Sequence, residues 1–227
     1  MRIYVVGTDT GVGKTRAAAT LACAMRGALT IVKLVQTGLA HNAPGDAENA
    51  ASLADAARCF AETSPLRHPT PWRELARFPA PADPWNAALA ANAAPLEVTE
   101  HLAALGAIGG DLIVEGSGGA AVPFNADASL SDVARAAGCE AVLVIALRLG
   151  CISHALLTLA YLEGLGMPVR GAILCEPLAP VADDYRAQVE RALAAKVKAT
   201  RRLAFASDAA RGVAADAASL IPFLENR

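Results

Sequence analysis

The chain has 227 residues, of which 54% are hydrophobic but only 4% are aromatic. This length buries a substantial core and lies near the upper limit for one compact domain, so we expect a single domain over residues 1–227. The formal net charge is −2, from 20 basic and 22 acidic residues, and no basic run is longer than Arg201-Arg202. This distribution argues against a nucleic-acid-binding surface.

The lengths of the apolar stretches and the spacing of the cysteines indicate in which cellular compartment the protein acts. No apolar run approaches the roughly 18 residues that span a bilayer, and the first expected strand is not preceded by a basic region and a cleavage site. The cysteines are odd in number, widely spaced and free of any CxxC pair, which is typical of reduced thiols: Cys23, Cys59, Cys139, Cys151 and Cys175. We therefore expect a cytoplasmic protein without membrane association.

Short apolar runs alternate with longer helical patterns along the chain. The expected strands cover residues 3–6, 29–32, 111–114, 141–145 and 169–174, and a helix is expected over about 15–26. The alternation predicts an α/β fold with a parallel sheet and helices on both faces. The proline-rich segment 64–84 is expected to form an irregular loop, which either packs on the surface or faces a substrate.

The run GTDTGVGKT, from Gly7 to Thr15, links the first expected strand to the first expected helix. In this context glycines let backbone N–H groups point at phosphate oxygens beside a helix N-terminus, so a purely structural turn is the weaker alternative. Lys14 is expected to reach the β- and γ-phosphates of a nucleoside triphosphate, and the Thr15 hydroxyl to bind Mg²⁺. The spacing departs from the common pattern, because Thr8 stands where a glycine is usual.

Two acids could complete a magnesium site. Asp46 opens a helix, and Glu115 follows the strand at 111–114, at the edge where ligands gather in parallel sheets. Taken alone, Asp46 fits a helix N-cap better than a metal ligand. The glycines within residues 116–119 could bring backbone amides to a second anion, or form a tight strand-to-helix turn.

Lys33 ends the second expected strand and is followed by Leu-Val-Gln-Thr-Gly. This order directs the Lys33 ammonium and the Thr37 hydroxyl toward the same edge of the sheet as the phosphate loop. A lysine at a strand end can also be merely solvated, but its place near the loop favours a function.

Together these motifs resemble those of the dethiobiotin synthetase family. The resemblance rests on GTDTGVGKT, on KLVQTG in place of KPVQTG, on GDAE, on VEGSGG in place of VEGAGG, and on LGCISHA. It implies a homodimer built on a parallel P-loop NTPase sheet. It also implies that ATP, or another nucleoside triphosphate, and Mg²⁺ drive closure of a ureido ring from 7,8-diaminopelargonate and carbon dioxide in biotin biosynthesis.

The resemblance assigns roles residue by residue. Mg²⁺ would be held by Thr15, Asp46 and Glu115, and the catalytic residues would be Lys14, Lys33 and Thr37. The nucleotide would contact Thr10, Gly11, Val12, Gly13, Lys14, Thr15, Glu115, Gly118 and Cys175. The substrate would contact Thr10, Lys33, Thr37, Gly118, Gly150, Cys151 and Ser153, the last three from the neighbouring subunit.

The implied chemistry is stepwise, through a carbamate and a carbamic–phosphoric anhydride. It needs positioning and positive charge more than a protein nucleophile. We accordingly interpret Cys151 as a small packed residue.

Several positions depart from the family pattern. Cys175-Glu176 replaces an Asn-Asp pair whose amide recognises adenine, and a thiol offers no matching donor and acceptor, so we hypothesise a relaxed choice of nucleotide. Trp85 and Arg148 replace a histidine and a lysine near the substrate, so substrate details can differ.

Three alternatives remain open. Partition or septum-positioning ATPases carry an additional lysine early in the loop, where this chain has Thr8-Asp9-Thr10, and tend to have a basic face or tail. A cobyrinate-type amide ligase would need a further amidotransferase domain. A non-catalytic paralogue would not need the lysines and acids named above.

Overall fold

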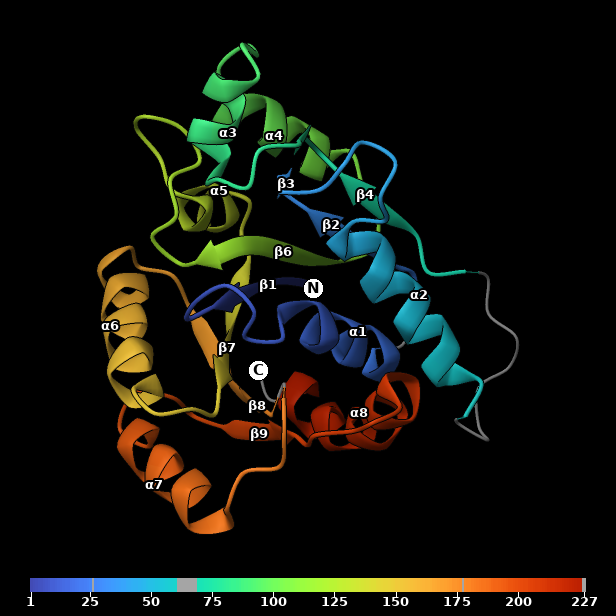
Figure 1. The fold of residues 1–227 in the computed structure, drawn as a ribbon, viewed down its shortest axis with the longest axis vertical. Coiled ribbons are helices and arrows are strands. Elements are labelled where there is room, and N and C mark those ends of the chain that lie inside the picture. The colour runs from blue at the N-terminus through green and yellow to red at the C-terminus, as the bar shows by residue number, and fades with distance from the viewer. Residues whose placement is uncertain (26, 61–68, 177, 226–227) are drawn as a thin grey trace.

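The computed structural model describes residues 1–25, 27–60, 69–176 and 178–225. At its centre lies a seven-stranded sheet with the order β4-β2-β6-β1-β7-β8-β9 (Figure 1). Neighbouring strands in it run parallel. The strands are β1 (Arg2–Gly7), β2 (Leu29–Lys33), β4 (Trp72–Glu74), β6 (Asp111–Gly119), β7 (Glu140–Ala146), β8 (Val169–Cys175) and β9 (Thr200–Leu203). A small second sheet pairs β3 (Gln36–Thr37) with β5 (Arg77–Phe78).

Helices cover both faces of the large sheet, as the sequence predicted (Figure 1). One face packs against α1 (Lys14–Ala24), α2 (Asp46–Arg58) and α8 (Ala209–Glu225). The other packs against α3 (Pro84–Ala90), α4 (Val98–Gly106), α5 (Leu130–Ala136), α6 (Cys151–Gly164) and α7 (Asp183–Leu193). Successive side chains of a strand point to opposite faces, so Ile3 and Val5 of β1 enter the first core and Tyr4 and Val6 enter the second.

The five predicted strands lie within β1, β2, β6, β7 and β8. The predicted helix 15–26 is α1, which ends at Ala24; Arg26 lies outside the described residues. β6 is longer than predicted and runs on to Gly119, while the next helix begins only at Leu130. The prediction of a strand end at Glu115 and the alternative of a tight turn at 116–119 are therefore both wrong.

The prediction for the proline-rich segment is corrected in part. Residues 64–68 lie outside the described residues, but the segment is not irregular throughout, because it contains β4 and β5. β4 pairs with β2 at the edge of the large sheet, where charged side chains are tolerated. Its sequence Trp-Arg-Glu therefore lacks the apolar run on which strand prediction depends.

None of the described helices has both the length and the apolar character needed to cross a membrane. All five cysteines are free thiols.

Candidate active site

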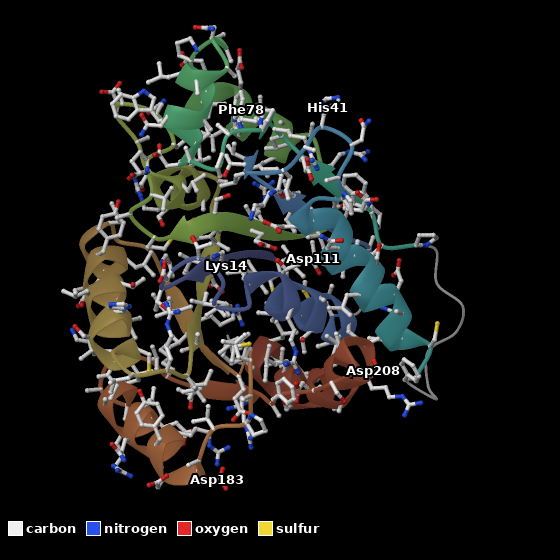
Figure 2. The ribbon with its side chains drawn as sticks, viewed as in Figure 1. Lys14, His41, Phe78, Asp111, Asp183 and Asp208 are labelled. Atoms are coloured by element: carbon white, nitrogen blue, oxygen red, sulfur yellow. The ribbon has the colours of Figure 1, made fainter. Side chains whose placement is uncertain are left out.

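The phosphate loop joins the end of β1 to the start of α1 at the middle of the sheet, where Figure 2 labels Lys14. Gly13 precedes α1 with a φ of 98°, a conformation that favours glycine. A Cβ atom at this position would also lie 2.5 Å from Sγ of Cys175. The loop therefore requires glycine here, both for its backbone angle and for its contact with β8.

Lys14 is held against the loop by two backbone carbonyls. Its Nζ donates to the Asp9 oxygen at 2.9 Å and to the Gly118 oxygen at 3.0 Å. Burial, and then the charge of Lys33, lower the pKa of Lys14 to about 8. The contact with Gly118 brings the glycine-rich end of β6 to the loop.

Lys33 is 2% exposed and makes a cluster of contacts with acidic residues. Its Nζ lies 2.6 Å from Oδ2 of Asp46 and 3.1 Å from Oε1 of Glu115, and it donates to the Gly116 carbonyl at 3.0 Å. Burial opposes its charge, but the carboxylates raise the pKa of Lys33 above its ordinary value. Lys33 is therefore a buried, paired cation, and the alternative of a solvated strand end is wrong.

The three predicted magnesium ligands converge around this cluster. The Thr15 hydroxyl donates to Oε1 of Glu115 at 3.2 Å, and Lys33 joins Glu115 to Asp46. Asp46 makes no side-chain cap of α2, whose N-cap is Gly45, so the N-cap alternative for Asp46 is wrong. Its carboxylate is free to face the site instead.

The donor set fits Mg²⁺. Oε2 of Glu115 is buried without a hydrogen-bond partner among the described residues, as an atom reserved for a ligand would be. Within the described ranges no three His, Cys, Asp or Glu side chains form a metal-binding group. A site of two carboxylates and a hydroxyl nevertheless suits Mg²⁺, which keeps waters and phosphate oxygens as its other ligands.

These residues line one cavity of about 880 Å³. The predicted site residues in its lining are Thr10, Gly11, Gly13, Lys14, Thr15, Lys33, Thr37, Asp46, Glu115, Gly118 and Cys175. Val12, which belongs to the same loop, is buried and is not among the lining residues. Pro81, Ala82 and Asp83 also contribute, so the end of the proline-rich segment faces the cavity.

Gly150, Cys151 and Ser153 lie outside the lining of this cavity. Gly150 is the N-cap of α6, and Cys151 is buried with its Sγ 3.5 Å from the Tyr185 hydroxyl. That burial agrees with the interpretation of Cys151 as a packed residue. The hydroxyl of Tyr185 donates in turn to the Arg148 carbonyl at 2.7 Å, and the Arg148 guanidinium pairs with Asp9 of the phosphate loop at 2.6 Å.

The end of the cavity beside Cys175 contains residues that sequence reasoning did not assign. Glu176 is buried and accepts from the fork of Arg202 at 3.0 Å and from the Phe205 N–H at 2.9 Å. Burial works against its charge, but these hydrogen bonds outweigh it and hold the pKa of Glu176 below its ordinary value. Glu176 therefore fixes the backbone that leads from β9 to Phe205, and Phe205 lines the cavity.

Other lining residues could have been found inside the motifs. Gln36 and Ser117 belong to KLVQTG and VEGSGG, and Arg16 directly follows the phosphate loop. Gln36 accepts the backbone N–H of Asp46 at 2.9 Å, and the Ser117 hydroxyl donates to the Val35 carbonyl at 2.7 Å. Both support neighbouring site residues through the backbone, a role that motif spacing does not reveal.

Comparisons with known proteins show the family to which the chain belongs. A family model described as an AAA domain matches residues 1–205. The ATP-dependent dethiobiotin synthetase BioD of Rhodococcus jostii is 36% identical over 179 residues, which cover 76% of this chain and 72% of the relative. That of Anaeromyxobacter dehalogenans is 34% identical over 177 residues, covering 76% and 75%. The bifunctional biotin biosynthesis protein BioCD of Bordetella avium is 35% identical over 83% of this chain and 36% of that protein.

Solved structures share the fold at low sequence identity. The septum site-determining protein MinD of Pyrococcus horikoshii, complexed with Mg-ADP, matches with a TM-score of 0.57 at 14% identity over 99% of this chain and 96% of its own. A ParA family ATPase from Chlorobium tepidum gives 0.52 at 15% identity over 100% and 93%. At these identities the likeness shows the P-loop ATPase fold alone.

Replacing Glu176 with Gln should lower the free energy of unfolding at pH 7 by about 1–3 kcal/mol, because the Arg202 fork loses its anionic acceptor. The folded-state pKa of Glu176 lies below its ordinary value of 4.5. The stabilisation is therefore complete above the unfolded-state pKa and is lost as the pH falls through the folded-state pKa. Urea unfolding of both proteins from pH 7 to pH 3 measures this.

The matched control is Glu163→Gln, which removes only an exposed ion pair with Lys196 and should change the unfolding free energy by less than about 1 kcal/mol. A difference between wild type and Glu176→Gln that did not shrink at acidic pH would contradict the assignment.

Proposed function

We propose that this chain, which belongs to the family of ATP-dependent dethiobiotin synthetases, closes the ureido ring of dethiobiotin in biotin biosynthesis. It is accordingly an ATP-dependent ligase. The proposed substrates are 7,8-diaminopelargonate, carbon dioxide or bicarbonate, and a nucleoside triphosphate. The observation that carries the proposal is the convergence of two buried lysines, two carboxylates and the Thr15 hydroxyl in one cavity.

The proposed reaction has three steps. One amine of the substrate adds to carbon dioxide and loses a proton, which gives a carbamate. A carbamate oxygen attacks the γ-phosphorus, the bond to the β-phosphate oxygen breaks, and a carbamic–phosphoric anhydride and the nucleoside diphosphate result. The second amine attacks the carbamoyl carbon and loses a proton, the bond from this carbon to the phosphate oxygen breaks, and inorganic phosphate leaves with the proton balanced as the ring closes.

The lysines supply the positive charge that these steps need. Negative charge accumulates on the carbamate and on the transferred phosphoryl group, and fixed cations in a water-poor site stabilise it strongly. We assign Lys14 to the β- and γ-phosphates and Lys33 to the carbamate and γ-phosphate. Thr10 and Thr37, which line the same cavity, would position the diamine.

Thr15, Asp46 and Glu115 would hold Mg²⁺, as their oxygen donors and the unpartnered Oε2 of Glu115 support. When bound, the ion would neutralise charge on the triphosphate. Lys33 contacts both carboxylates, so it would keep them in place while they bind.

The base of the nucleotide would occupy the end of the cavity lined by Cys175, Phe205 and Ala206. Burial raises the pKa of the Cys175 thiol to about 11, so this side chain is a neutral, weak donor. The carboxylate of Glu176 already accepts hydrogen bonds from the Arg202 guanidinium and from the Phe205 N–H. Neither side chain offers the paired donor and acceptor that would select adenine.

A homodimer would complete the site. Leu149, beside Gly150, is 95% exposed, and Leu157 of α6 is 68% exposed, so the segment that carries the predicted substrate-carboxylate contacts also carries two exposed leucines. A second copy packed there would bury these leucines and bring Gly150, Cys151 and Ser153 to the substrate. We further propose that the protein acts in the cytoplasm, where its five free thiols would remain reduced.

Purified protein incubated with 7,8-diaminopelargonate, bicarbonate, Mg²⁺ and ATP should form dethiobiotin, detected by mass spectrometry. Lys14→Ala and Glu115→Ala should each lower turnover by at least about 10²–10³-fold, because the first removes a cation that stabilises the transferred phosphoryl group and the second removes a ligand of its Mg²⁺ counterion. Circular dichroism should show that both variants remain folded. Lys196→Ala, at an exposed lysine, is the control and should retain activity. If no nucleotide supports product, the proposed function is wrong.

If the site does not select one base, kcat/KM for ATP, CTP and GTP should differ by no more than about tenfold. The reason is that no side chain beside Cys175 offers a donor and an acceptor that match one base alone. Cys175→Asn restores a donor and an acceptor and should raise the preference for ATP by about tenfold. The control is Cys59→Asn, at an exposed thiol on the end of α2. A strong preference of the wild type for ATP would overturn the hypothesis.

Light scattering should give twice the 23.2 kDa chain mass for the purified protein. Leu157→Glu should shift it toward the monomer and reduce activity in parallel, because a charge buried at the interface is unpaired. Leu89→Glu, at an exposed leucine of α3, is the control. A wild-type monomer with full activity would exclude the dimer.

A further inference from the structure

The loop between β3 and α2, residues 38–45, is held by an ion pair from the segment that forms β4 and β5. Arg77 donates from Nε to Oε2 of Glu74 at 2.7 Å and from NH2 to Oε1 at 2.8 Å, a two-bond fork. Its remaining terminal nitrogen, NH1, donates to the carbonyls of Ala40 at 3.1 Å and Ala43 at 2.9 Å. One guanidinium thus links β4 and β5 to two points of the loop.

The same pair packs against the residue that precedes Asp46. A Cβ atom at Gly45 would lie 1.7 Å from Oε1 of Glu74 and 2.7 Å from NH2 of Arg77. Gly45 is the N-cap of α2, so the ion pair lies directly against the start of that helix. The start of α2 cannot move toward β4 without displacing two charged side chains.

Asp46 is therefore restrained from both sides. Its backbone N–H donates to Oε1 of Gln36 at 2.9 Å, and its carboxylate lies 2.6 Å from Nζ of Lys33. Glu74 and Arg77 are 10% and 16% exposed, so the ion pair is largely withdrawn from the screening of water. The hydrogen bonds that Arg77 donates to Glu74, against a smaller effect of burial, raise the pKa of Arg77 above its ordinary value.

The geometry excludes a direct chemical role for the pair. Neither Glu74 nor Arg77 lines the cavity that holds Lys14, Lys33 and Glu115. Both act on the loop backbone and on Gly45. An arginine is suited to this task because its rigid fork serves a carboxylate and two carbonyls at once, which a lysine ammonium on a flexible stem cannot reproduce.

We propose that Glu74 and Arg77 are positioning residues, which fix the start of α2 so that the Asp46 carboxylate is preorganised to bind the divalent cation. The inference rests on the proposed role of Asp46 as a metal ligand. Residues that orient a metal ligand without touching the metal typically change affinity 10–100-fold when they are removed. If the ion pair between Glu74 and Arg77 served only folding, its removal would lower the melting temperature and leave the affinity for the cation unchanged.

The test is Mn²⁺ affinity, measured by electron spin resonance on the full chain with a non-hydrolysable ATP analogue, well below the melting temperature of each variant. Arg77→Ala should weaken Mn²⁺ binding about tenfold or more, while affinity for the analogue without metal stays within about twofold because the phosphate loop is untouched. Arg77→Lys and Glu74→Gln, which keep most of the volume, should lie between Arg77→Ala and wild type. Arg73→Ala, at an exposed arginine on β4 next to Glu74, is the matched control and should bind Mn²⁺ as wild type does.

Asp46→Asn separates this inference from the proposed function. In that background Arg77→Ala should weaken Mn²⁺ binding no further, because the residue that it positions is already disabled. If Asp46→Asn weakens binding and none of the variants at 74 and 77 does, the positioning inference is wrong and the metal role of Asp46 stands. If Asp46→Asn binds Mn²⁺ as wild type does, both are wrong. Should Arg77→Ala fail to fold, Arg77→Lys and Glu74→Gln decide between these outcomes.

Discussion

The buried ammonium group of Lys33 determines how the charged side chains around the cavity are arranged. Lys33 is almost completely removed from water, and a buried cation is tolerated only when carboxylates and hydrogen-bond acceptors compensate it. The compensation comes from three elements: β2 carries the lysine, β6 supplies Glu115 and the Gly116 carbonyl, and α2 supplies Asp46. In the sheet register Lys33 pairs directly with Glu115, so a slip of either strand by one residue would leave an unpaired charge inside the protein. The site and the sheet therefore stabilise one register together.

The fold was predictable where strands are buried on both faces. β1, β6, β7 and β8 are covered by helices on either side, so each contains a short apolar run by which the strand can be recognised in the sequence. β4 and β9 lie at the two ends of the sheet and carry Trp-Arg-Glu and Thr-Arg-Arg-Leu. Charged residues protect an exposed strand edge from pairing with another chain, but they interrupt the apolar run by which a strand is identified in a sequence.

The site was predictable to the extent that its residues are contiguous with the phosphate loop or directly follow a short apolar run. Lys14, Thr15, Lys33 and Glu115 come from such places, and parallel strands bring their carboxyl ends to one edge. Two features could not be found in that way. Asp46, which was assigned to the metal only through the family resemblance, has the sequence context of a helix cap, and its contact with Lys33 and its place in the cavity lining show that its carboxylate faces the site. Arg77 supports the site through carbonyls more than 30 positions earlier in the chain, a contact that the order of residues does not encode.

The close packing of Gly13 against Cys175 has a consequence for how this family could evolve or be redesigned. The backbone of the phosphate loop leaves no space on one side of position 175, since even a methyl group at Gly13 would collide with the sulfur. A longer side chain introduced at 175 must therefore adopt a rotamer that points away from the loop. The glycine that the loop requires at position 13 would thus also constrain the orientation of any longer side chain at position 175.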